Sequence, residues 1–143
     1  MLISIKSPKK SLNKAFLKMK PHRSEIEKFK VNLVQLLDRT NEAEYEEFNK
    51  NLIIDFLKKT YYDPNHFVNT KGRNDLVIHN GEQPKSSVGV IVEAKQPTNK
   101  NEMITTGNLN AKALQELVLY YLRERITLKN LEVRHLVITN IYE

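Results

Sequence analysis

The sequence predicts one α/β domain, an α+β arrangement in which a small central mixed sheet is flanked by helices. Three observations predict this fold class. Apolar residues at helical spacing fill residues 23–60, strand-like periodicity takes over from residue 66, and a long helical segment separates the last two strands. The resulting order, α-α-β-β-β-α-β, is typical of a mixed sheet covered by helices. A chain of 143 residues also has the length of a single domain, about 100–200 residues.

Residues 1–22 are predicted to be a basic N-terminal arm with one short helix over 11–20. Its apolar residues recur at helical spacing: Leu12, Phe16 and Met19. Residues 1–20 carry six lysines and no acid, and residues 1–40 hold 10 basic against 3 acidic residues. This charge fits either a polyanion such as nucleic acid or a solubilising arm. The apolar stripe favours packing on the rest of the domain.

Residues 23–60 are predicted to form two helices. The first begins with a capping box of Ser24 and Glu27. A second cap near Asn41 begins the next helix, which extends to about Lys59. We expect the second helix to bury one apolar stripe: Tyr45, Phe48, Leu52 and Phe56.

Residues 66–143 contain the predicted sheet and its crossover helix. The predicted strands are 66–69, 75–79, 88–95 and 135–139, and the helix is 109–126. Asn80-Gly81 is a turn signal that joins the second and third strands into a hairpin. The third strand is apolar on both faces, as expected of a central strand, and the crossover places the last strand parallel to it. The helix is expected to face inward with Ala113, Leu114, Leu117, Val118 and Tyr121.

The composition excludes several classes of protein. The absence of cysteine excludes disulfides, thiolate metal sites and cysteine nucleophiles. No apolar run approaches the roughly 18 residues of a membrane span. Lys6 follows Met1–Ile5 directly and leaves no room for the apolar core of a signal peptide. We therefore expect a cytoplasmic protein.

Three ionisable residues lie at the ends of apolar strands: Asp75, Glu93 and Lys95. Strand side chains alternate, so Glu93 and Lys95 share one face and Ala94 points to the other. In a hairpin through Asn80-Gly81, the start of the second strand lies beside the end of the third, so all three charges converge. A simpler interpretation is that Asp75 caps a turn while Glu93 and Lys95 form a surface ion pair.

A convergent pair of carboxylates indicates a bound cation, because two neighbouring carboxylates repel each other unless a cation lies between them. Ligation by oxygen alone suits Mg²⁺, for which Mn²⁺ can substitute. Such an ion activates water and neutralises developing charge on a phosphate, and a lysine ammonium beside it stabilises the same charge. The pattern therefore favours phosphodiester hydrolysis.

Asp75, followed 18 residues later by Glu93-Ala94-Lys95, resembles the PD-(D/E)xK nuclease motif, and the element order matches its restriction-endonuclease-like core. Arg73-Asn74 stands where the family pattern has proline. Three longer stretches are similar to the N-terminal endonuclease domain of fused type IIG restriction–modification enzymes: 7–16, 69–81 and 90–97. In those enzymes an adenine methyltransferase and a DNA-recognition region follow the nuclease domain.

The resemblance implies specific roles for individual residues. Asp75, Glu93 and the backbone carbonyl of Ala94 would be metal ligands, and Lys95 the catalytic lysine. The family often adds an acid from the helix before the sheet, for which Glu47 is preferred over Glu44 and Glu46. A glutamine from the helix after the sheet is also common, and Gln115 is the candidate, whereas the spacing of Tyr120 fits poorly.

The expected function is therefore Mg²⁺-dependent cleavage of double-stranded DNA. The nuclease domain is expected to span residues 1–143 of a longer chain and to pair transiently with a second copy. The loops are expected to contact DNA phosphates through Lys71, Arg73, Lys85 and Lys100. A non-catalytic DNA-binding or assembly module on the same fold is the alternative. A resolvase of branched DNA is a third possibility within the nuclease class.

Overall fold

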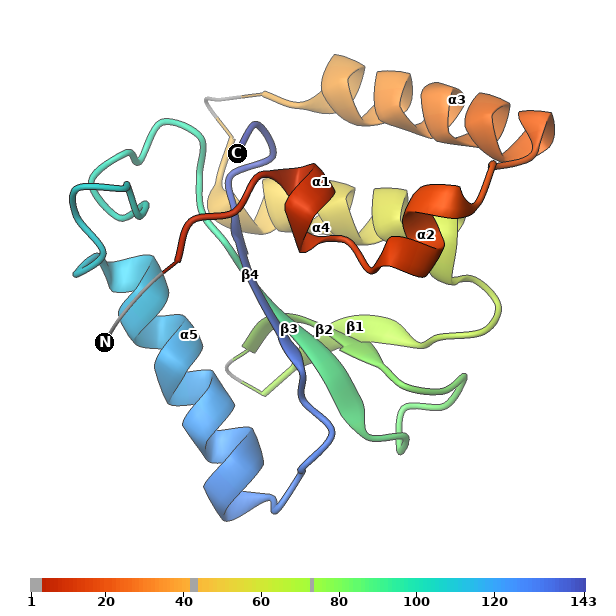
Figure 1. Ribbon diagram of the computed structural model, residues 1–143. Coiled ribbons are helices and arrows are strands. Elements are labelled where there is room, and N and C mark those ends of the chain that lie inside the picture. Colours follow the sequence, from red (N-terminus) through yellow and green to blue (C-terminus); the bar gives the residue numbers. More distant parts are fainter. Residues whose placement is uncertain (1–3, 42–43, 73) are drawn as a thin grey trace.

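The computed structural model describes residues 4–41, 44–72 and 74–143, and at Asn74 and Asp75 it describes the backbone only. Its centre is a four-stranded sheet in the order β1-β2-β3-β4 (Figure 1). The strands are β1 (Val68–Lys71), β2 (Asn74–His79), β3 (Val88–Ala94) and β4 (His135–Thr139). The pairs β1–β2 and β2–β3 are antiparallel and β3–β4 is parallel, so the sheet is mixed as predicted.

Helices cover both faces of this sheet. The helical elements are α1 (Pro8–Ser11), α2 (Lys14–Lys18), α3 (Arg23–Arg39), α4 (Glu46–Leu57) with the π-helical turn η1 (Lys58–Tyr62), and α5 (Lys112–Leu122) with the π-helical turn η2 (Arg123–Thr127). Figure 1 shows α4 and α5 on opposite sides of the sheet and α3 stacked outside α4. None of the helices in the described ranges is long and apolar enough to cross a membrane.

The alternation of side chains along the strands divides the core into two clusters. On the α4 face, Ile54 and Leu57 pack against sheet residues Val68, Leu76, Ile78 and Val92. On the α5 face, Leu117 and Tyr120 pack against sheet residues Val77, Val88 and Ile91. Since Leu76 and Val77 are neighbours in β2, their side chains point to opposite faces. The central strands are therefore apolar on both faces because a helix covers each.

Three of the predicted strands agree with the structure to within one residue at each end, whereas β1 begins at Val68 and ends at Lys71, two residues later than predicted at both ends. The hairpin through Asn80-Gly81 is confirmed by the antiparallel β2–β3 pairing. The tight turn between β1 and β2 contains Gly72, whose φ of 63° lies in the left-handed region that favours glycine.

The prediction for the basic arm was wrong in two respects. The single helix over 11–20 is replaced by two short helices, α1 and α2. Every residue from 4 to 28 is exposed, so the apolar stripe of the arm does not pack into the core as expected. The exposed fractions of Leu12, Phe16 and Met19 are 53%, 64% and 67%. Short helical segments of this kind present too little apolar surface to be buried cooperatively.

The helix predictions also needed corrections at their ends. The first turn of α3 is closed by the His22 backbone N–H, which donates to the Glu25 carboxylate at 2.7 Å, rather than by Ser24 and Glu27. The next helix starts at Glu46 rather than near Asn41.

The predicted apolar stripe of α4 is rotated relative to the observed buried face. Tyr45 is 84% exposed and Phe48 is 37% exposed. The residues of α4 that are buried are Asn49, Lys50, Leu52 and Ile53. In α5, Ala113 and Leu117 are buried as predicted, but Tyr120 is buried where Tyr121 was expected, and Val118 is 39% exposed.

Candidate functional site

The candidate site lies where the central strand β3 ends. Glu93 and Lys95 are only 1% and 3% exposed, although both carry ionisable groups. They lie on the same side of the strand, the side that faces α5. The backbone N–H of Lys95 donates to the Thr139 carbonyl at 2.9 Å, so pairing with β4 holds the lysine one residue beyond β3. The strand cannot continue past Pro97, which has no N–H to donate.

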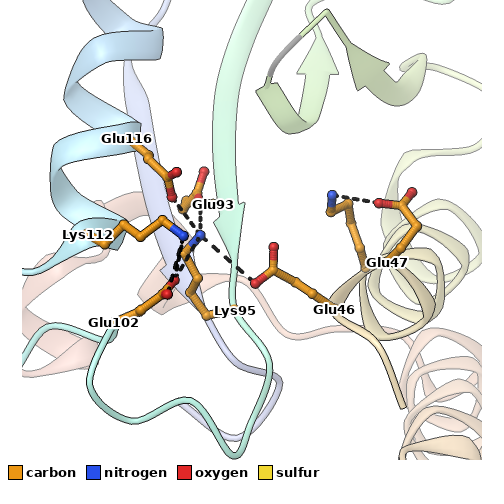
Figure 2. A network of polar contacts seen from close by, with 8 residues as sticks. Glu46, Glu47, Glu93, Lys95, Glu102, Lys112 and Glu116 are labelled. Carbon is orange, nitrogen blue, oxygen red and sulfur yellow. Dashed lines mark hydrogen bonds and ion pairs between the residues drawn. The ribbon is translucent and has the colours of Figure 1, made fainter.

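Four carboxylates surround the Lys95 ammonium (Figure 2). Lys95 Nζ lies 2.6 Å from Glu93 Oε1 and 2.7 Å from Glu116 Oε2. The carboxylates of Glu102 and Glu46 are farther away, at 3.8 and 4.0 Å from Nζ. A second ammonium, that of Lys112, lies 3.1 Å from Glu102. We call these six residues the Lys95 cluster: Glu46, Glu93, Lys95, Glu102, Lys112 and Glu116.

Each part of the Lys95 cluster comes from a different element. Glu93 and Lys95 come from the end of β3, Glu46 from the first turn of α4, and Glu116 from α5. Glu102 lies in the loop that leads from β3 to α5. The cluster therefore exists only when both helical layers are packed against the sheet.

The electrostatic balance of the Lys95 cluster is negative, with four carboxylates against two ammonium groups. Burial by itself lowers the pKa of Lys95, but hydrogen bonds to Glu116 and Glu93 and the nearby charge of Glu46 raise that pKa well above its usual value. Burial of Glu102 would raise its pKa, but hydrogen bonds from Lys112 and Asn99 lower it. Lys95 is thus a charged donor at neutral pH, held in fixed surroundings.

The structure brings together two of the three residues on which the sequence prediction depends. Glu93 and Lys95 form the predicted same-face pair. The side chain of Asp75, like the whole of Arg73, lies outside the described residues. The backbone of β2 is described, and its next residue, Leu76, pairs with Val92. Ala94, the predicted backbone ligand, pairs with Thr139 of β4.

The structure does not bring Glu47 or Gln115 to the cluster. The Glu47 side chain is 64% exposed and accepts from Lys50 Nζ at 2.8 Å, on the side away from Lys95 (Figure 2). Gln115 is exposed, and its amide donates to Asn110 Oδ1 at 2.9 Å. The adjacent residues Glu46 and Glu116 occupy the positions that the sequence analysis gave to Glu47 and Gln115.

A sequence signal for Glu116 was present and was missed. Buried residues of α5 recur at Ala113, Leu117 and Tyr120, and Glu116 fits the same stripe. An acid on an otherwise apolar stripe lies beside the core, where its charge needs a partner, and the Glu116 side chain is only 30% exposed. Glu46 likewise lies on the stripe of α4 that continues through Asn49 and Ile53. In both helices the stripe, once correctly placed, identifies the glutamate that faces inward.

Within the described part of the chain, no group of three histidine, aspartate or glutamate side chains is arranged to hold a metal ion. The carboxylates of the cluster gather around the Lys95 ammonium instead. Their chemistry nevertheless suits a hard divalent cation. All of the possible acidic ligand atoms are carboxylate oxygens, and the cluster holds more carboxylates than ammonium groups.

Fold and site together define an α/β domain with a buried lysine–carboxylate cluster at the end of the central strand of a mixed sheet. The chain belongs to a family described as Domain of unknown function (DUF7149), whose match covers residues 6–143. Neither a curated protein nor a solved structure matches the chain.

Proposed function

We propose that this chain is a Mg²⁺-dependent DNA endonuclease domain of the PD-(D/E)xK type that hydrolyses phosphodiester bonds. The observation that carries the proposal is the surplus of carboxylates around the buried Lys95 ammonium. Glu93 and Lys95 are buried and the other three carboxylates are 25–35% exposed, so the excess negative charge around the buried pair is costly unless a further cation binds. The motif resemblance, Asp75 with Glu93-Ala94-Lys95, supplies the reaction class.

The residues that would hold the ion are Glu93, Asp75 and the backbone carbonyl of Ala94. Glu93 is almost fully buried, so its carboxylate is held in place by the surrounding packing. When bound, Mg²⁺ supplies activation of water and neutralisation of charge on the phosphate.

The chain's own groups perform the remaining tasks. The charged Lys95 ammonium donates hydrogen bonds to the attacking water or to a non-bridging phosphate oxygen. Glu93 and Glu116 fix its direction through contacts of 2.6 and 2.7 Å. Glu46 and Glu102 strengthen the negative field from a greater distance. Glu116 and Glu46 are therefore positioning residues in this proposal.

We further propose that the domain acts in a restriction–modification system in the cytoplasm. The methyltransferase and DNA-recognition regions of such a system would lie elsewhere on the full-length chain. Cleavage of both strands of a duplex would then use transient pairing of two nuclease domains. These statements rest on the resemblance to type IIG enzymes.

The proposal is tested with metal and DNA separately. Isothermal calorimetry with Mg²⁺ or Mn²⁺ should show binding to the wild-type chain, a clear loss in Glu93→Gln, and no change in Gln115→Ala, whose side chain is exposed. The rate of nicking of supercoiled plasmid should likewise be unchanged in Gln115→Ala and clearly lower in Glu93→Gln than in the wild type. Nicking should stop in EDTA. Metal binding that is equal in Glu93→Gln and the wild type would favour a non-catalytic DNA-binding or assembly module.

A further inference from the structure

The basic arm, whose described residues are 4–22, is the most strongly charged exposed segment of the described chain. All of its residues are exposed. Its six lysines stand before the first acid of the sequence, Glu25. They are Lys6, Lys9, Lys10, Lys14, Lys18 and Lys20. The arm is thus a concentrated positive charge in contact with solvent.

The arm's lysines differ from most, though not all, of the lysines in the rest of the domain. Six of the eleven lysines after residue 24 form ion pairs with described carboxylates: Lys30, Lys50, Lys59, Lys71, Lys95 and Lys112. No lysine of the arm forms an ion pair with any described residue. Their positive charge is therefore not compensated by any described carboxylate and is available to an external anion.

The arm lies beside the helical layer without being buried in it. Phe16 and Met19 line an open groove of about 790 Å³ that α3 and η1 complete with Phe29 and Tyr61. Phe16 and Met19 remain 64% and 67% exposed. Lys14 and Lys18, one turn apart in α2, lie on the same side of that helix. Phe16 and Met19 therefore border the groove beside α3 without being buried, and the lysines of the arm are exposed.

We propose that this arm binds the phosphate backbone of duplex DNA independently of base sequence, at a surface separate from the Lys95 cluster. The choice of DNA as the polyanion rests on the proposed function. Lysine ammonium groups are point charges that suit phosphate oxygens and carry no base readout. The helices of the arm, of 4 and 5 residues, are too short to present a continuous apolar face to a lipid surface.

The test is the salt dependence of DNA binding in EDTA, where no cleavage occurs. Fluorescence anisotropy with a 30-base-pair duplex, from 50 to 300 mM KCl, compares the wild type with two triple variants. The arm variant carries Lys10→Gln, Lys14→Gln and Lys18→Gln. The control variant carries Lys30→Gln, Lys59→Gln and Lys129→Gln, which remove the same charge from other exposed positions.

Each phosphate contact contributes about 0.9 to the slope of log K against log salt concentration. The arm variant should lose about 2–3 from this slope, whereas the control variant should lose less than about 1. Equal slopes in the two variants would overturn the proposal. It would also be overturned if the arm variant lost binding to vesicles of phosphatidylserine and phosphatidylcholine but kept its affinity for DNA.

The two proposals fail in different ways. Because binding is measured without metal, a slope loss confined to the arm variant supports the arm even if the wild type never cleaves DNA with Mg²⁺. Conversely, cleavage by the wild type together with equal slopes in both variants would sustain the nuclease and reject the arm.

Discussion

Two buried ionic groups on this domain differ in how their charges are balanced. In one, Lys71 Nζ at the end of β1 lies 2.9 Å from Glu124 Oε1 in η2. Glu124 is 2% exposed, and its second oxygen accepts from Asn130 Nδ2 at 3.1 Å. One carboxylate thus faces one ammonium, and both of its oxygens are bonded. Such a pair joins β1 to η2, and its charges are balanced without a further ion.

The Lys95 cluster has the opposite balance. Two carboxylates contact the same ammonium closely, and two more lie within 4.0 Å of it. A domain that needed only a structural ion pair here would not gain from gathering three further carboxylates, whose side chains are 25–35% exposed, since like charges repel. The comparison shows that the ratio of carboxylates to ammonium groups, rather than the degree of burial, distinguishes a candidate functional site from an ion pair that only stabilises the fold.

The largest expected effect is on cleavage in Lys95→Met. Removing the ammonium donor should lower the rate of plasmid nicking with Mg²⁺ by at least about 10²–10³-fold. Calorimetry should still detect Mg²⁺ binding, because the carboxylates keep their charge. Lys59→Met is the matched control, since Lys59 pairs with Asp55 outside the cluster and its side chain is 51% exposed. Nicking that persists in Lys95→Met would refute the assigned role.

The second prediction concerns the stability of the balanced pair. Lys71→Met leaves the Glu124 carboxylate buried and opposed only by Asn130. Breaking a buried pair costs about 3–5 kcal/mol, and we expect about 2–3 because the Lys71 side chain is 38% exposed. Urea unfolding measures this loss of stability. Lys59→Met is the control: it breaks a pair whose side chains are 51% and 42% exposed and should lose less than about 1 kcal/mol. Mg²⁺ should not restore the stability of Lys71→Met.

The third prediction separates two adjacent residues of α4. Glu46→Gln removes a carboxylate that faces Lys95, whereas Glu47→Gln removes one that faces Lys50 and solvent. We expect about a tenfold loss of Mg²⁺ affinity or nicking rate in Glu46→Gln, as for residues that support a metal site, and less than about a twofold change in Glu47→Gln. Similar losses in both variants would show that the helix face is assigned incorrectly.

The smallest effect is expected at an exposed carboxylate that belongs to neither group. Hydrogen bonds from Ser87 and Asn80 lower the pKa of Glu132 from its ordinary value of 4.5. A lowered pKa means that Glu132 stabilises the fold above its ordinary pKa and that this contribution disappears as the pH falls through the lowered value. The difference in Tm between the wild type and Glu132→Gln should therefore be present at pH 7 and vanish once the pH has fallen below the lowered pKa. A difference that grew on acidification would have the wrong sign.

The strands were predictable because their signals are local. The short apolar run of Val88–Ala94 and the Asn80-Gly81 turn indicate strands and a hairpin whatever lies around them. The alternation of side chains along any strand then placed Glu93 and Lys95 on one face. The helix faces were less predictable, since Tyr45 and Phe48 are apolar and yet exposed, whereas Lys50 is buried.

The sequence alone therefore determined the order of elements, the hairpin and the pairing of an acid with a lysine at the end of the central strand. It did not determine which helix glutamates reach that lysine. Moving one residue along a helix rotates a side chain by about 100° around the axis, so Glu46 and Glu47, or Gln115 and Glu116, face different surroundings. Only the packing of α4 and α5 on the sheet decides which of them points inward, because that packing sets the rotation of each helix about its own axis.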